Sequence, residues 1–158
     1  MTARIAGLQR SGGGVPKIRV ERAEVQLTGL VGDWQRNRKH HGGPDRALCL
    51  YSAELLDALR AEGHDAFPGA LGENVTINGL DWTLLCPGTG LRLGGVEAEV
   101  TAFAAPCRTI AHVFRSGSYS RISEKRHPGW SRVYVRILRG GSMAIGDPVV
   151  VDPAVVGR

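Results

Sequence analysis

The stretch VEAEVTAF, from Val96 to Phe103, has the pattern that decides the fold. Its apolar residues occupy every second position up to Ala102, with glutamate or threonine between them. Because side chains of a β-strand point alternately to opposite faces, this pattern predicts a strand with one buried and one solvated face. The stretch RVYVRI, from Arg132 to Ile137, alternates in the same way and predicts a late strand.

Further short strands are predicted along the chain, with few helices between them. Alternation or a continuous apolar run predicts strands at residues 23–27, 46–51, 74–77 and 149–151. Ser52 can cap a short helix whose Leu55, Leu56 and Leu59 share one face, and Gly63 is placed to end it. Six or more strands separated by about 10 to 20 residues favour a mainly β protein with a few short helices, built as a barrel or a strongly bent sheet.

The totals indicate one globular domain. A chain of 158 residues suits a single domain, taken here as residues 1–158. The net charge of +5 would suit an anionic ligand such as a phosphate, although it also serves solubility or weak nucleic-acid contact. Neither a signal peptide nor a run of apolar residues long enough to span a membrane is present, so a soluble, cytoplasmic protein without membrane contact is expected. Signatures of phosphate loops, dinucleotide folds and serine-hydrolase elbows are missing.

The three cysteines, Cys49, Cys86 and Cys107, have no spacing typical of a disulfide framework or a cysteine-rich zinc site. Cys107 follows Pro106 and opens a segment with apolar residues at helical spacing. It is therefore predicted at a helix start, where unpaired N–H groups favour a thiolate, and Arg108 would act in the same direction. The alternative is a buried, unreactive thiol. Cys49 and Cys86 are interpreted as structural.

Histidine and glycine meet in the sequence His40-His41-Gly42-Gly43. The glycines permit positive φ angles and close approach of a ligand, and an imidazole can bind an anion or a metal. His41 is preferred because consecutive residues of an extended segment point to opposite sides, so only one histidine could serve a site. A plain turn explains the same residues.

Other charged and amide residues have both a functional and a structural interpretation. Asp45 and Arg46 can orient one another, hold a phosphate or form an exposed ion pair. Glu73 and Asn74 stand where a loop enters a strand, either at a barrel mouth or as plain loop residues. Several basic residues are interpreted as solvated strand faces, although an arginine on the ligand side could bind a phosphate. These residues are Lys17, Arg19, Arg22, Arg132, Arg136 and Arg139.

Four segments, taken in order, resemble the MOSC domain, which is named for the C-terminal part of molybdenum cofactor sulfurases. They are GLVGDWQRNRKHHGGPDRALCLYSAE, PGALGENVTINGL, GTGLRLGGVEAEVTAFAAPCRTI and GWSRVYVRILRGGSMAIGDPV. The resemblance extends from about Ile5 to Val150 and rests on the ordered motifs GD, HGG, GEN and PC. It implies a closed or partly open β-barrel related to the pyruvate kinase barrel domain. It also implies a pocket for the molybdenum cofactor (molybdopterin), a phosphorylated pterin whose dithiolene holds the metal.

The resemblance further implies which residues act. Cys107 falls on the family's cysteine, whose thiolate would ligate molybdenum or carry a persulfide sulfur. The residues implied in cofactor binding are His41, Gly42, Gly43, Arg46, Glu73 and Asn74. Arg132 is added as a contact to the pterin or its phosphate, and Arg108, beside the cysteine, is placed in the same site.

Three functions stay open. The first is a molybdenum-cofactor enzyme that, like relatives acting on N-hydroxylated bases and amidoximes, reduces an N–O bond of a small molecule with electrons from a separate reductase. The second is a sulfur carrier that takes sulfur from a cysteine desulfurase onto Cys107 and passes it to a cofactor or a biosynthetic acceptor. The third is a non-catalytic module that binds RNA or another anion. Because aromatic residues make up only 6% of the chain and do not cluster, nucleic-acid binding is not expected.

Overall fold

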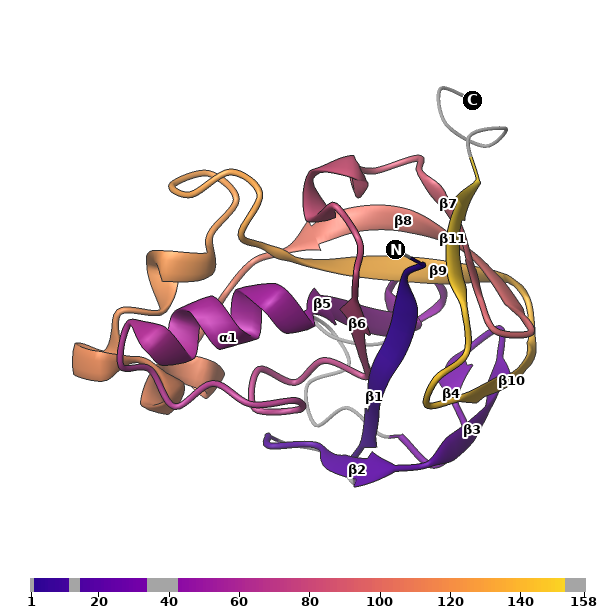
Figure 1. Ribbon diagram of the computed structural model, residues 1–158, viewed down its shortest axis with the longest axis horizontal. Coiled ribbons are helices and arrows are strands. Elements are labelled where there is room, and N and C mark those ends of the chain that lie inside the picture. The colour runs from indigo at the N-terminus through magenta and orange to yellow at the C-terminus, as the bar shows by residue number, and fades with distance from the viewer. Residues whose placement is uncertain (1, 12–14, 34–42, 153–158) are drawn as a thin grey trace.

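An eight-stranded sheet that curls on itself forms the centre of the protein (Figure 1). The computed structural model describes residues 2–11, 15–33 and 43–152. The strand order in the sheet is β11-β7-β8-β9-β5-β6-β1-β2. In chain order the strands are β1 (Arg4–Arg10), β2 (Ile18–Val20), β5 (Leu48–Ser52), β6 (Val75–Asn78), β7 (Gly90–Leu93), β8 (Val96–Ala104), β9 (Arg132–Arg139) and β11 (Val149–Asp152).

A second, three-stranded sheet lies at one end of the first, with the order β10-β3-β4. Its strands are β3 (Arg22–Gln26), β4 (Gly29–Leu30) and β10 (Gly141–Ala144). The chain passes from β9 to β10 through Gly140, where a Cβ atom would lie 2.5 Å from the carbonyl oxygen of Val25. Only glycine fits this close approach between the two segments.

The strand β11, at one edge of the large sheet, meets β1, the strand next to the opposite edge, over a short stretch. Arg4 of β1 forms an isolated antiparallel bridge with Pro148, immediately before β11. The N–H of Ile5 donates to the carbonyl of Asp147 at 2.9 Å. The N–H of Gly146 donates to the carbonyl of Ile5 at 2.8 Å, and the N–H of Val149 donates to the carbonyl of Ala3 at 2.9 Å. Because β1 and β11 form no continuous strand ladder within the described residues, the sheet is a partly open barrel. The prediction of a mainly β, barrel-like fold is confirmed in this form; the single domain spanning 1–158 stays a prediction.

Helices are few and short. The helix α1 (Ala53–Ala61) connects β5 to its parallel neighbour β6. It begins as predicted, since the Ser52 hydroxyl accepts a hydrogen bond from the N–H of Leu55 at 3.1 Å, and Leu56 and Leu59 are buried. Five 3₁₀ helices complete the described elements: η1 (Pro44–Arg46), η2 (Trp82–Leu84), η3 (Arg108–Val113), η4 (Arg115–Gly117) and η5 (Tyr119–Ile122). None of the helices in the described ranges has the length and apolar character that a membrane crossing requires.

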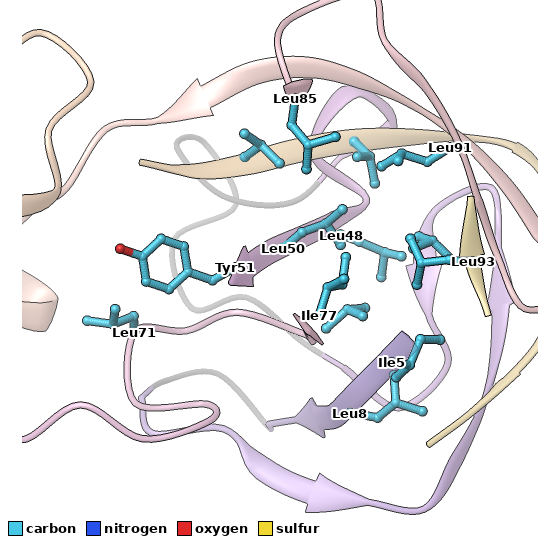
Figure 2. Packing of buried hydrophobic residues seen from close by; sticks show 14 of the residues in the cluster. Ile5, Leu8, Leu48, Leu50, Tyr51, Leu71, Ile77, Leu85, Leu91 and Leu93 are labelled. Atoms are coloured by element: carbon cyan, nitrogen blue, oxygen red, sulfur yellow. The ribbon is translucent and has the colours of Figure 1, made fainter. Parts of the chain in front are cut away.

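The main hydrophobic core fills the inside of the curled sheet (Figure 2). Leu48 and Leu50 of β5 and Ile77 of β6 point into it and are fully buried. The intervening Cys49 is also buried, but on the other face, in a small cluster with Ala104 and Tyr134. The continuous apolar run in β5 therefore reflects a strand that is covered on both faces.

Several local predictions were wrong. The strand predicted from Arg46 begins only at Leu48, because Pro44 starts a 3₁₀ turn. The helix predicted after Cys107 is a 3₁₀ helix rather than an α-helix. No strand was predicted for β1, β2, β4, β7 and β10, whose sequences lack a clear run of alternating apolar and polar residues.

Truncation of the core at the centre of the sheet tests this arrangement. Leu50→Ala should lower the free energy of unfolding by about 2 to 5 kcal/mol, because it leaves a cavity in a fully packed strand. Leu138→Ala is the matched control, because this leucine of β9 is 47% exposed, and it should cost less than about 1 kcal/mol. Urea denaturation of both variants gives the comparison, and equal losses would contradict the described packing.

Candidate functional site

The candidate site lies on the face of the large sheet opposite the main core, where β5, β8 and β9 adjoin. Cys49 pairs with Tyr134 across β5 and β9, and Ala104 pairs with Arg132 across β8 and β9. Since side chains alternate along a strand, Arg132 and Tyr134 emerge on the same face, while Val133 between them points into the core. The strands β5 and β9 thus bring Cys49, Arg132 and Tyr134 together beside Ala104 of β8.

Cys107 stands just beyond the end of β8. Its backbone is extended (φ −140°, ψ 175°), and it is the N-cap residue of η3, as the sequence predicted. The side chain is neither fully exposed nor fully buried. Burial raises the pKa of Tyr134, and the nearby thiols of Cys49 and Cys107 add to this shift. The Cys107 thiol therefore lies within electrostatic reach of the Tyr134 hydroxyl.

Arg46 reaches the same tyrosine from η1. Its guanidinium carbon lies 5.4 Å from the centroid of the Tyr134 ring, a cation–π distance. The carboxylate of Asp45 lies 3.3 Å from a guanidinium nitrogen of Arg136. The Thr101 hydroxyl of β8 also donates to the Asp45 carbonyl, which fastens η1 to the sheet.

Of the predicted His-Gly-Gly motif, the structure describes only Gly43. Its φ angle of 84° is strained for other residues, although a Cβ atom there would meet nothing within 4 Å. The glycine is therefore explained by backbone conformation rather than by crowding. His41 and Gly42 lie outside the described residues, and their part in cofactor binding stays a prediction.

Asn74 is buried and holds neighbouring segments together. Its side-chain oxygen accepts from the N–H of Cys49 at 3.0 Å, and its amide nitrogen donates to the Asp33 carboxylate at 3.0 Å. Its own N–H donates to the carbonyl of Cys49 at 2.7 Å. Asn74, immediately before the first residue of β6, thus extends the contact between β5 and β6. A direct contact between Asn74 and a cofactor stays a prediction.

Glu73 is fully buried in the loop of residues 69–74, which we call the GEN loop. One carboxyl oxygen accepts from the N–H of Leu71 at 3.2 Å, and the other has no hydrogen-bond partner among the described residues. Burial raises the pKa of Glu73 to about 7, against opposing effects of main-chain hydrogen bonds and of Arg132. The carboxyl group therefore changes charge near neutral pH.

Arg132 is 4% exposed, so its interpretation as part of a solvated strand face is wrong. One terminal nitrogen donates to the carbonyl of Leu71 at 2.7 Å. The other terminal nitrogen donates to the carbonyls of Ala104 at 3.5 Å and Ala105 at 3.3 Å. Its predicted contact with the pterin or phosphate stays a prediction. Arg136, by contrast, is exposed as interpreted, with 46% of its side chain accessible.

A buried ion pair between Lys17 and Asp33 borders the site and was not predicted. The two charged atoms are 2.8 Å apart, and the side chains are 3% and 5% exposed. Lys17 had been interpreted as solvated, which is wrong. The neighbouring Ile18, although apolar, is 71% exposed. Burial at these two positions is therefore the reverse of what hydrophobicity alone would indicate. Asp33 belongs to the GD motif, and this motif was the one feature of the sequence that pointed to the pair.

The three thiols are free but differ in their surroundings. Burial raises the pKa of Cys49 to about 11, with Arg132 as the largest opposing influence, so Cys49 is a neutral thiol at neutral pH. Cys86 is exposed in a turn, 3.5 Å from the Thr89 hydroxyl. Within the ranges that the structure describes, no group of three or more histidine, cysteine, aspartate or glutamate residues could hold a metal. Cys107 is therefore the thiol at this site that is open to a ligand.

The pKa of Glu73 makes stability depend on pH. Unfolding lowers this pKa from about 7 to the ordinary 4.5, so the unfolded state loses its proton first. The stabilising contribution is complete below pH 4.5, falls as the pH rises to 7 and is lost above it, a change on the order of 3 kcal/mol. Glu73→Gln should remove this decrease in the free energy of unfolding between pH 4.5 and 7, because the amide does not titrate. Urea denaturation across this pH range measures the effect. The matched control is Glu97→Gln, at an exposed position of β8, which should show the same decrease as the wild-type protein. The same pH dependence of the free energy of unfolding in all three proteins would refute Glu73 as its cause.

The chain is similar in sequence to known bacterial proteins. The model of the MOSC domain matches residues 37–150. Protein YiiM of Escherichia coli (strain K12) is 34% identical over 123 residues, which cover 73% of this chain and 54% of that protein. The uncharacterized protein YflK of Bacillus subtilis (strain 168) is 31% identical over 116 residues, covering 73% and 52%. The chain thus spans about half the length of these relatives.

Solved structures share the fold. YiiM from Geobacillus stearothermophilus superimposes with a TM-score of 0.73 at 24% identity, over 98% of this chain and 77% of that one. The YUAD protein from Bacillus subtilis gives a TM-score of 0.71 at 22% identity, over 94% of each chain. At this identity the likeness concerns the fold alone. Because the family model covers well over half of the sequence, the chain belongs to the MOSC domain family.

Proposed function

We propose that this chain binds the molybdenum cofactor with Cys107 as the metal ligand, and that it reduces N-hydroxylated substrates with electrons from a separate reductase. The observation that carries the proposal is the position of Cys107. It is a partly exposed thiol three residues after Ala104, which packs against Tyr134, on a segment whose Ala105 carbonyl accepts a hydrogen bond from the buried Arg132. Membership of the MOSC family supports the choice of cofactor.

The residues present fit such a group in charge and in ligand type. A thiolate is a soft ligand that suits a transition metal, and arginine binds phosphate through two parallel hydrogen bonds. Arg46 is partly exposed and Arg108 is fully exposed directly after Cys107, so both guanidinium groups can reach an anionic ligand. The cofactor, when bound, supplies the redox-active metal centre.

The predicted contacts separate into two groups by burial. Arg46, Arg108 and the main chain at Gly43 are accessible, and we assign them to direct contact with the cofactor. Glu73 and Asn74 are at most 1% exposed, and we assign them to holding the loops that surround it. The three free thiols also favour a reducing compartment, and we propose the cytoplasm.

Metal analysis tests the proposal. Protein purified from a host that makes the cofactor should contain molybdenum near one atom per chain, together with pterin fluorescence after release. Cys107→Ser should lose most of the metal and the reductase-dependent activity, because the soft ligand is removed. Cys86→Ser is the matched control, an exposed thiol away from Arg132 and Tyr134, and should keep both. Full metal and activity in Cys107→Ser would overturn the assignment.

A sulfur carrier is the second candidate, favoured by the exposure of Cys107 outside any strand ladder. A cysteine desulfurase converts cysteine to alanine and holds the released sulfur as its own persulfide. Attack of the Cys107 thiolate on the outer sulfur of that persulfide would form the Cys107 persulfide and release the desulfurase thiolate. Incubation with a cysteine desulfurase and cysteine should then add one sulfur atom at Cys107, detected by mass spectrometry and absent in Cys107→Ser. Failure of the wild-type protein to gain this adduct would exclude sulfur carriage.

A further inference from the structure

The segment that carries Cys107 has few attachments of its own. The strand β8 ends at Ala104, and residues 105–107, which we call the cysteine segment, pair with no strand. Pro106 within it has no N–H group to donate. The Ala105 carbonyl accepts a hydrogen bond from the Arg132 guanidinium at 3.3 Å. The Ala104 carbonyl before it accepts from the same nitrogen and from the Ser131 hydroxyl, at 3.5 and 3.4 Å.

The same guanidinium also forms a hydrogen bond with the GEN loop. Its other terminal nitrogen donates to the Leu71 carbonyl at 2.7 Å, while the Leu71 N–H donates to the Glu73 carboxyl at 3.2 Å. Main-chain groups on both sides of Leu71 are thus held by two buried side chains of opposite charge. Arg132 lies 61 residues from Leu71 and 27 from Ala105 in the chain, so it joins two distant segments.

We propose that Arg132 is a positioning residue for Cys107, which fixes the cysteine segment against the GEN loop and is not itself a ligand of the cofactor. It is 96% buried, and both of its terminal nitrogens donate to main-chain carbonyls of this chain. The inference uses the proposed function only for the importance of Cys107; the positioning itself needs no bound metal.

The fork shape of arginine is essential to this role. A guanidinium presents donors in a plane and can reach carbonyls on two segments at once, whereas the lysine ammonium is a compact charge on a flexible stem. Arg132→Lys therefore keeps the charge but cannot restrain both segments together. A purely structural role would lower stability alone, while positioning also changes the chemistry of the Cys107 thiol.

Alkylation of Cys107 in the metal-free protein measures that chemistry. All variants carry Cys86→Ser, which removes the exposed thiol, and Cys49 is shielded by burial. The rate of alkylation is recorded as a function of pH, with the free energy of unfolding as a separate readout. Arg132→Lys should change the alkylation rate at neutral pH roughly tenfold, because the cysteine segment is no longer held in one position. Hydrogen exchange at the amides from Cys107 to Ile110 should also accelerate.

Arg136→Lys is the matched control on the same strand, four residues along β9 and exposed. It should leave the alkylation profile and the hydrogen exchange unchanged. A folded Arg132→Lys protein with the wild-type pH profile would overturn the proposal, whatever its stability.

The wild-type chain provides a second measurement in case Arg132→Lys fails to fold. The side-chain N–H signals of Arg132 in NMR spectra should exchange slowly with solvent and should shift when Cys107 is alkylated. The signals of the exposed Arg139 serve as the reference. Arg132 signals that exchange as fast as those of Arg139, or that do not respond to alkylation, would also overturn the proposal.

Failure of this inference can be told apart from failure of the proposed function. Molybdenum bound through Cys107, together with an alkylation profile indifferent to Arg132→Lys, would refute positioning and leave the cofactor assignment in place. Absence of molybdenum, together with a profile that depends on Arg132, would refute the cofactor assignment and leave positioning in place.

Discussion

The buried guanidinium of Arg132 is the constraint on which the arrangement of the candidate site depends. A cation removed from water needs hydrogen-bond acceptors and a nearby negative charge. The acceptors are main-chain carbonyls of two segments, at Leu71 and at Ala104 and Ala105, and the nearby charge is that of Glu73 when it is ionised. Neither segment can move away without leaving a buried donor unpaired, which costs more than the bond itself contributes. Pairing of β8 with β9 brings Arg132 to these carbonyls, so folding of the sheet and assembly of the site are coupled.

A second buried charge pair extends this network toward the N-terminal part of the chain. The Asp33 carboxylate accepts hydrogen bonds from Lys17, from the N–H of Ser11 and from the amide of Asn74. Asn74 in turn holds the N–H of Cys49 in β5. Each member is satisfied by a partner from a different segment, so removal of one would leave an unpaired polar group in the interior. The network therefore favours one arrangement of the connections around the site over alternatives with similar hydrophobic burial.

The sequence could predict the elements whose signals are local. The alternation from Val96 and the Ser52 cap of α1 each lie within a few residues, and both were confirmed. Periodicity separates the two faces of a strand but does not say which face will be covered. Lys17 is buried and Ile18 is exposed because the buried carboxylate of Asp33, 16 residues further along the chain, pairs with the ammonium group of Lys17. Arg132 is a similar case, since its acceptors come from segments that become neighbours only in the folded sheet. Local patterns thus predict strands and turns, while burial of a charge depends on long-range pairing.

The two thiols of the site show the same dependence on the fold. Cys49 lies inside β5 against Tyr134, where burial raises its pKa to about 11 and keeps it neutral. Cys107 stands beyond the end of β8, partly open to solvent. The sequence argument for its reactivity relied on a helix dipole, but the six-residue 3₁₀ helix that follows has fewer aligned peptide units than an α-helix of ordinary length. The basic groups of this region are side chains instead, namely Arg46 on the Tyr134 ring and Arg108 next in the chain. Placement of these arginines, rather than the helix, is the physical ground for proposing Cys107 as the ligand of an anionic cofactor.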